Sequence, residues 1–198
     1  MDINIKEKRK TEIMHIASDL FYSKGISDTT ISEISYLANI RKGTFYEYFK
    51  NKDDVINEYI KTYFKNAYIQ IDDEIENYKT NREKIIFIVK FLFMSKTTDK
   101  KFTYILVEFL RLTFNKKKEE SEKLHHFNEH NLNLIVKYLE KGIEEKEFVA
   151  CDTQEIALEM ISSILGNLVL SLSYEHKECD NSTKCNVLTI LDAIENKK

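Results

Sequence analysis

The chain of 198 residues contains no proline and no tryptophan, and it has only four glycines. Proline breaks the interior of a helix, and glycine weakens it by about 1 kcal/mol relative to alanine. The scarcity of both residues therefore favours long, uninterrupted helices. We expect an all-α protein with about nine helices.

Long apolar segments are scarce as well. No stretch approaches the roughly 20 apolar residues that a transmembrane helix needs, and the first ten residues lack the apolar core of a secretory signal. The three cysteines, Cys151, Cys179 and Cys185, are an odd number, and reduced thiols in a reducing compartment explain them most simply. We expect a cytoplasmic protein that has no membrane partner.

Signatures of catalysis are missing too. The sequence has no glycine-rich phosphate loop and no nucleophile elbow, so we expect no catalytic residues and no cofactor. Two weak clusters could supply metal or thiol chemistry. A solvated helix face and an exposed polar loop explain them more simply, so we expect no metal site. The clusters are Glu122, His126 and His130 on one predicted helix, and His176, Cys179 and Cys185 in a predicted loop.

Charge is distributed unevenly along the chain. The net charge is −3, but residues 1–52 hold nine Lys/Arg and seven Asp/Glu, which gives +2, whereas the remaining 21 Lys/Arg and 26 Asp/Glu give −5. A positive segment in an otherwise acidic chain is a candidate for contact with nucleic acid.

Residues 29–52 predict two short helices joined by a tight turn. Thr30 and Glu33 have the spacing of a capping box, which begins the first of these helices. Asn39 is the turn residue, because asparagine tolerates left-handed backbone. The second helix spans about 41–49, and Phe45 and Phe49 are expected in the core.

The second of these helices opens with side chains suited to DNA. Arg41 and Lys42 can reach guanine edges or phosphates, although a solvated surface would also accommodate them. Gly43 lets the backbone approach DNA closely. The Thr44 side chain suits a base edge or a phosphate, and the Tyr46 hydroxyl can reach a phosphate. Thr30 and Lys52 begin the flanking helices, where phosphates are favoured. The predicted DNA-binding residues are Thr30, Arg41, Lys42, Gly43, Thr44, Tyr46 and Lys52.

At this point the sequence resembles the TetR (tetracycline repressor-like) family of bacterial transcriptional regulators. The resemblance covers residues from about 10 to 55 and implies a three-helix DNA-binding head, a connecting helix and a ligand-binding body that dimerises through its last two helices. It is carried by Ala17, Phe21, Gly25, Thr29, Thr30, Ile34, Ala38, Lys42, Gly43, Thr44, Phe45, Tyr46, Tyr48, Phe49 and Lys52.

Three positions depart from the family pattern. Ser35 replaces a usual alanine, Asn39 replaces a glycine, and Arg41 replaces a small capping residue. Arg41 gives up a cap worth about 1 kcal/mol and places positive charge at the positive end of a helix dipole. We hypothesise that Arg41 is present because it contacts DNA.

The remainder of the chain predicts a helical bundle. We expect a DNA-binding domain over 1–50 and a ligand-binding and dimerisation domain over 51–198, connected by a helix over about 51–78. Predicted helices near 85–93 and 102–114 are apolar on more faces than one neighbour covers. These faces fit either ordinary core or a cavity for a small apolar or amphipathic effector. The candidate lining residues are Phe91, Phe109, Tyr138 and Ile164.

These features together predict a ligand-responsive transcriptional regulator, foremost a repressor. We expect a homodimer that binds a pseudo-palindromic double-stranded operator, because two heads can read successive major-groove faces. A small-molecule effector would release the DNA. The alternative is a DNA-binding or helical interaction protein that has no small-molecule effector.

Overall fold

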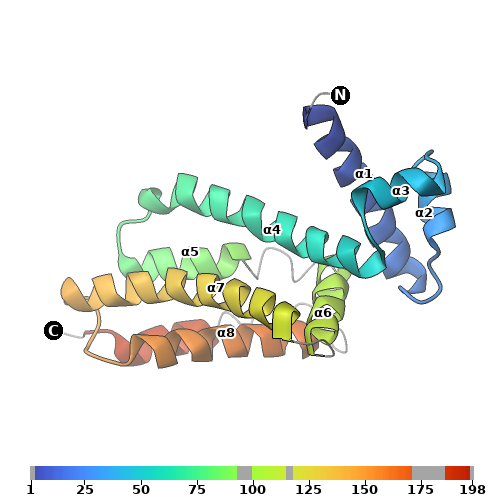
Figure 1. The fold of residues 1–198 in the computed structure, drawn as a ribbon. Helices are drawn as coiled ribbons and strands as arrows, with labels where there is room; N and C mark the ends of the chain where they lie inside the picture. The colour runs from blue at the N-terminus through green and yellow to red at the C-terminus, as the bar shows by residue number, and fades with distance from the viewer. Residues whose placement is uncertain (1–2, 93–99, 115–117, 171–185, 197–198) are drawn as a thin grey trace. The chain divides into compact units, whose positions relative to one another are not determined.

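The computed structural model describes residues 3–92, 100–114, 118–170 and 186–196, with side chains for all of these except 3–4, 113–114 and 118–128. Nearly all of the described chain is helical, and the expected all-α fold is confirmed (Figure 1). The helices are α1 (Ile3–Lys24), α2 (Ile31–Leu37), α3 (Lys42–Tyr48), α4 (Lys52–Glu74), α5 (Asn81–Leu92), α6 (Lys100–Phe114), α7 (Lys118–Glu144) and α8 (Thr153–Leu170). A short 3-10 helix, η1 (Ile75–Asn77), follows α4, and residues 186–194 form a terminal helix.

The chain forms two compact units. The first comprises Met1–Lys65 and Tyr104–Asn115, and the second comprises Asn66–Thr103 and Lys116–Lys198. Both α4 and α6 contribute residues to each unit. These units are defined by packing. The expected division at residue 50 separates a DNA-binding from a ligand-binding function, and it stays a prediction.

Several helices begin at residues whose side chains cap the first turn. The Thr80 hydroxyl accepts from the Glu83 amide at 3.1 Å, and the Glu83 carboxylate accepts from the Thr80 amide at 3.1 Å, which completes a capping box at α5. The Asp152 carboxylate accepts from the amide of Glu155 at 3.1 Å at the start of α8. Asn51 Oδ1 accepts from the amide of Asp54 at 2.8 Å at the start of α4.

The predicted end of the fourth helix was wrong by about one turn. The α-helix ends at Glu74, and η1 replaces the expected continuation to residue 78. Tyr78 then takes an extended backbone conformation, and its ring stacks on Phe87 of α5 with centroids 4.6 Å apart. This tertiary contact ends the helix at a point that local periodicity does not mark.

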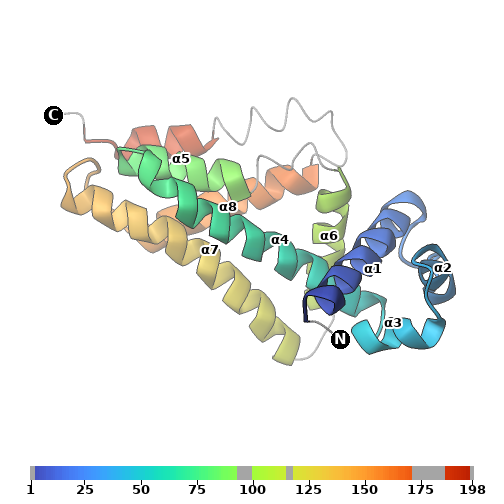
Figure 2. The same ribbon diagram turned by 90° about the horizontal axis from the view of Figure 1, so that it is seen from above.

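The second unit is built around α5, α7 and α8, which lie side by side in both views (Figure 2). Their facing sides bury aliphatic side chains. The buried residues include Ile85, Ile88 and Leu92 of α5, Ile135 and Leu139 of α7, and Met160, Ile164 and Leu168 of α8.

One carboxylate joins the ends of two of these helices. Glu147 follows α7, and its carboxylate accepts from the backbone amides of Asn81 and Arg82, both at 2.8 Å. The first amides of a helix have no partner within the helix, and a carboxylate suits the positive end of the helix dipole. Glu147 therefore fixes the start of α5 against the end of α7.

The end of α7 also depends on a glycine. A methyl group at Gly142 would lie 2.2 Å from Cδ2 of the Phe148 ring. The amide of Phe148 donates to the Gly142 carbonyl at 3.0 Å, and Val149 donates to Ile194 at 2.8 Å. The chain therefore folds back over α7 so closely that only a hydrogen fits on residue 142.

Among the described helices, none has the length and apolar character to cross a membrane.

Candidate DNA-binding interface

The first unit holds a three-helix head. Buried apolar residues from α1, α2 and α3 meet in its core, and Phe45 and Phe49 are both buried as predicted. The core residues include Ile13, Ala17, Phe21, Ile34, Ala38, Phe45 and Phe49. Because these side chains fix α3 along one face, the opposite face is held outward in a defined orientation.

The turn between α2 and α3 has the geometry of a helix-turn-helix. Asn39 has φ 50°, the left-handed conformation that the sequence predicted. The amide of Ile40 donates to the Ser35 carbonyl at 2.9 Å, which closes the end of α2. The buried Ser35 hydroxyl donates to the Ile31 carbonyl at 2.7 Å. Serine in place of alanine therefore leaves no unsatisfied polar group.

The exposed face of α3 carries the predicted contact residues. Lys42 and Tyr46 are four residues apart and therefore lie on the same side of the helix, and Gly43 lies next to them. All three are exposed, and the Tyr46 side chain is 50% exposed. Thr44 is half-buried, so it sits at the edge of this face.

Two positions at the start of α3 leave the backbone accessible. Arg41 is exposed and occupies the N-cap, and its side chain makes no capping bond. The predicted loss of a cap is therefore confirmed. A methyl group at Gly43 would meet no atom within 4 Å. Glycine is thus not required there by the packing of the head.

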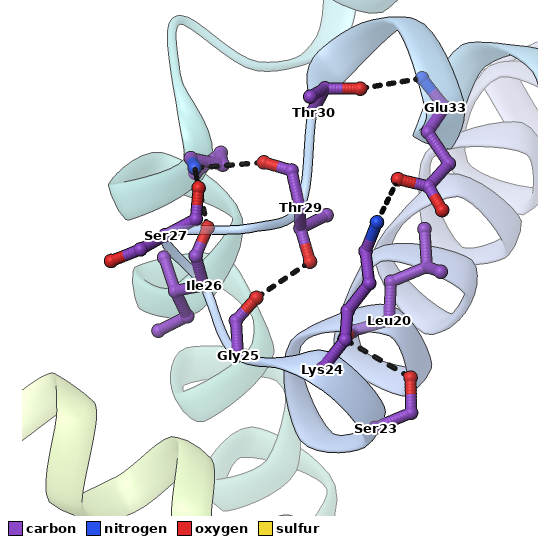
Figure 3. A network of polar contacts seen from close by, with 10 residues as sticks. Leu20, Ser23, Lys24, Gly25, Ile26, Ser27, Thr29, Thr30 and Glu33 are labelled. Carbon is purple, nitrogen blue, oxygen red and sulfur yellow. Dashed lines mark hydrogen bonds and ion pairs between the residues drawn. The ribbon is translucent and has the colours of Figure 1, made fainter.

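Only one of the two bonds of the predicted capping box forms at the start of α2. Thr30 Oγ1 accepts from the amide of Glu33 at 3.2 Å, as expected. The Glu33 carboxylate, which the sequence assigned to the amide of residue 30, instead pairs with the ammonium group of Lys24 (Figure 3). This ion pair joins the end of α1 to the first turn of α2, and Thr30 itself stays exposed.

Lys52 occupies an unexpected environment. Its ammonium group donates to the carbonyl of Ile26 at 2.5 Å and to that of Thr29 at 2.8 Å, and the Ser27 carbonyl lies at 3.5 Å. These carbonyls belong to the loop between α1 and α2. The structure therefore places Lys52 at the head, as predicted, but directs its donors to the protein's own backbone.

One residue that the sequence did not indicate supports the turn. Arg9 of α1 pairs with Glu12 at 2.6 Å, and its second nitrogen approaches the Asn39 carbonyl at 3.4 Å. Thirty residues separate Arg9 from Asn39, so no local spacing could have indicated this contact.

The four predicted lining residues do not gather in one unit. Tyr138 and Ile164 are buried in the second unit, and Phe91 is half-buried there with its ring 5.6 Å from that of Phe87. Phe109 is buried in the first unit instead.

The two candidate metal clusters fall largely outside the described residues. His176, Cys179 and Cys185 lie beyond them, as do the side chains of Glu122 and His126. Within the part of the chain that is described, no three His, Cys, Asp or Glu residues gather as a metal site.

A short helix pair with a left-handed turn, packed on α1 and exposing a basic and aromatic face on its second helix, defines a helix-turn-helix DNA-binding protein. Residues 13–59 match the model of the family described as bacterial regulatory proteins, tetR family. The head of this chain therefore carries the DNA-binding domain that this family model describes.

Relatives extend this similarity over at least nine tenths of the chain. An uncharacterised helix-turn-helix transcriptional regulator from Bacillus subtilis, YhgD, is 26% identical over 92% of this chain and 93% of its own length. A TetR transcription regulator from Haloarcula marismortui shares the fold with a TM-score of 0.83 at 17% identity, over 96% and 99% of the two chains. FadR from Bacillus subtilis, solved in complex with stearoyl-CoA, has a TM-score of 0.76 at 20% identity, over 90% and 97%.

Proposed function

We propose that this protein is a ligand-responsive repressor that acts in the cytoplasm without catalysing a reaction. It binds a pseudo-palindromic operator as a homodimer and releases it when a small molecule binds. The exposed row of Lys42, Gly43 and Tyr46 on α3 is the observation that carries the proposal. Such a row suits major-groove reading by a recognition helix, whose first residues reach base edges.

Selection of bound sequences from a random duplex pool tests this function directly. We expect a two-fold symmetric consensus whose half-sites are about 34–36 Å apart, or a multiple of that spacing. We also expect its affinity to fall steeply as salt is raised, because phosphate contacts release counterions. Failure to enrich any sequence would contradict the proposal.

Replacing Gly43 by alanine should separate folding from DNA binding. The added methyl group meets nothing within 4 Å in the free head, and alanine favours a helix by up to about 1 kcal/mol over glycine. We expect thermal stability to stay equal or rise, while operator affinity falls at least about tenfold because the helix cannot approach DNA as closely. Calorimetry and a fluorescence binding titration measure the two effects. Unchanged affinity would remove Gly43 from the interface.

Dimerisation has a candidate surface on α8. Its buried stripe includes Ala157, Ile161 and Leu168, and two further apolar residues of α8 are exposed. Leu158 is 57% exposed and Val169 is 47% exposed. These two residues are eleven apart, three helical turns, and so lie on one side of α8. Exposed apolar side chains in this arrangement suit the same helix of a second subunit.

We expect the double substitution Leu158→Glu/Val169→Glu to convert the dimer into monomers, because like charges would face each other across a two-fold axis. Light scattering after size exclusion measures the mass. The matched control is Ile69→Glu/Val149→Glu, which adds the same charge at exposed apolar positions elsewhere and should leave the dimer intact. A dimer that persists in the first variant would place the interface on another surface.

The proposed effector is a small apolar or amphipathic molecule held in the bundle of α5, α7 and α8. Buried aliphatic and aromatic side chains, Tyr138 and Ile164 among them, dominate this bundle. The structure of FadR contains stearoyl-CoA, an amphipathic molecule. Phe109 is the weakest member of the proposed lining, because it belongs to the other compact unit.

A polar pair inside the second unit supports an amphipathic effector. The Tyr68 hydroxyl donates to Oδ1 of Asn131 at 2.9 Å, and Asn131 is only 1% exposed. Burial raises the pKa of Tyr68 above its usual range, so the phenol stays neutral. Neutral hydrogen-bonding groups within an apolar bundle can orient the polar end of a ligand.

Release of DNA requires the effector to prefer the state of the dimer that does not bind the operator. A tenfold preference corresponds to about 1.4 kcal/mol of coupling, and the operator must weaken effector binding by the same factor. A screen of apolar and amphipathic compounds for those that displace the selected operator therefore identifies effectors by their effect on DNA binding alone.

A further inference from the structure

The loop between α1 and α2 has little regular structure of its own, yet it is held firmly. It begins at Gly25, whose φ of 89° turns the chain away from α1. The Thr29 side chain is 1% exposed, and its hydroxyl donates to the Gly25 carbonyl at 2.8 Å (Figure 3). The next residue, Thr30, caps α2. The position of this loop therefore sets the position of a residue predicted to contact DNA.

Lys52 supplies the bonds that join this loop to α4. A lysine ammonium group has three donors and no acceptor. Two of these donors are engaged at 2.5 Å and 2.8 Å with the carbonyls of Ile26 and Thr29, and the third oxygen within reach, that of Ser27, also belongs to the loop. Hydrogen bonds from a charged donor are stronger than those between neutral groups. The ammonium group is thus committed to the backbone in the free protein.

We infer that Lys52 is a positioning residue, which holds the α1–α2 loop in the shape that presents Thr30 to DNA, and not a phosphate ligand. This inference rests on the proposed DNA-binding function. It replaces the role that the sequence suggested for Lys52 and makes the start of α4 a support for α2.

The salt dependence of operator binding separates the two roles. Each phosphate neutralised by a lysine adds about −0.9 to the slope of log K against log salt, so loss of a phosphate contact in both heads should make the slope shallower by about 1.8. Loss of a positioning bond weakens binding without changing the number of neutralised phosphates. Lys52→Met keeps the length of the side chain and removes its donors.

We expect Lys52→Met to weaken operator binding about 10-fold to 100-fold with the salt slope of the wild type. Lys50→Met, which removes an exposed lysine two residues earlier, is the matched control for a change of charge and should bind nearly as well as the wild type. Lys52→Arg, which retains charge and donors, should recover most of the affinity. A slope that becomes shallower by about 1.8 in Lys52→Met would overturn the inference and make Lys52 a phosphate ligand.

A second variant keeps the test decisive if Lys52→Met fails to fold. Thr29→Val removes the bond to Gly25 from the other side of the loop and changes no charge. We expect the same loss of affinity with an unchanged slope, and wild-type affinity in Thr29→Val would overturn the inference. Failure of the wild-type protein to bind any selected DNA would instead contradict the proposed function itself.

Discussion

The double substitution Lys42→Ala/Tyr46→Ala should weaken operator binding by at least about 100-fold. Both side chains lie on the exposed face of α3, and neither is among the buried core residues of the head. A base or phosphate contact of this kind is worth about 1–3 kcal/mol, and a dimer loses each contact twice. Titration of a labelled operator measures the effect, and circular dichroism should show an unchanged helical content.

The matched control for this variant is Lys65→Ala/Lys90→Ala. Both lysines are exposed on other helices, and their substitution removes at least as much positive charge. We expect this control to bind the operator within a few-fold of the wild type. Equal binding by the two double variants would show that α3 does not read DNA, and attention would move to other exposed faces of the head.

Replacing Gly142 by alanine should destabilise the second unit. The new methyl group would lie 2.2 Å from Cδ2 and 2.4 Å from Cε2 of Phe148. The ring is buried, and its backbone amide is bonded to the Gly142 carbonyl. Overpacking of this kind costs about 1–3 kcal/mol, and thermal unfolding should shift downward by about 2–10 °C.

Gly166→Ala is the matched control, because Gly166 is also a glycine within a helix but has open space around it. The same substitution there should raise the free energy of unfolding by up to about 1 kcal/mol, since alanine favours a helix over glycine. If the same substitution lowers the free energy of unfolding at Gly142 and raises it at Gly166, the loss at Gly142 comes from its contact with Phe148. A neutral Gly142→Ala would mean that the ring moves aside at little cost.

Local chemistry allowed the sequence to predict much of this fold. Thr80 and Asp152 cap α5 and α8 through bonds to residues three positions on, and Asn39 takes the predicted left-handed turn. Each of these signals depends on residues within a few positions of one another, so spacing alone determines the bonds. The exposed row on α3 was predictable for the same reason, since Phe45 fixes which side of the helix faces the core.

Contacts between distant residues were not predictable in this way. The Glu33 carboxylate can accept either from a backbone amide or from Lys24, and only the packing of α1 against α2 favours Lys24. Lys52 reaches the Ile26 carbonyl across 26 positions. Helical periodicity likewise shows that Phe109 is buried, but it does not reveal which compact unit buries it.

The division of α6 between the two units affects how a chimeric regulator can be built from this chain. Residues 104–115 belong to the same compact unit as residues 1–65, although nearly forty positions of the other unit intervene. Buried side chains such as Ile105 and Leu106 are therefore part of the packing of the first unit. A chimera that grafts a new DNA specificity onto this sensor needs three seams, one near residue 65 and one at each end of the 104–115 segment. A single cut after the helix-turn-helix would leave behind part of the unit that it transfers.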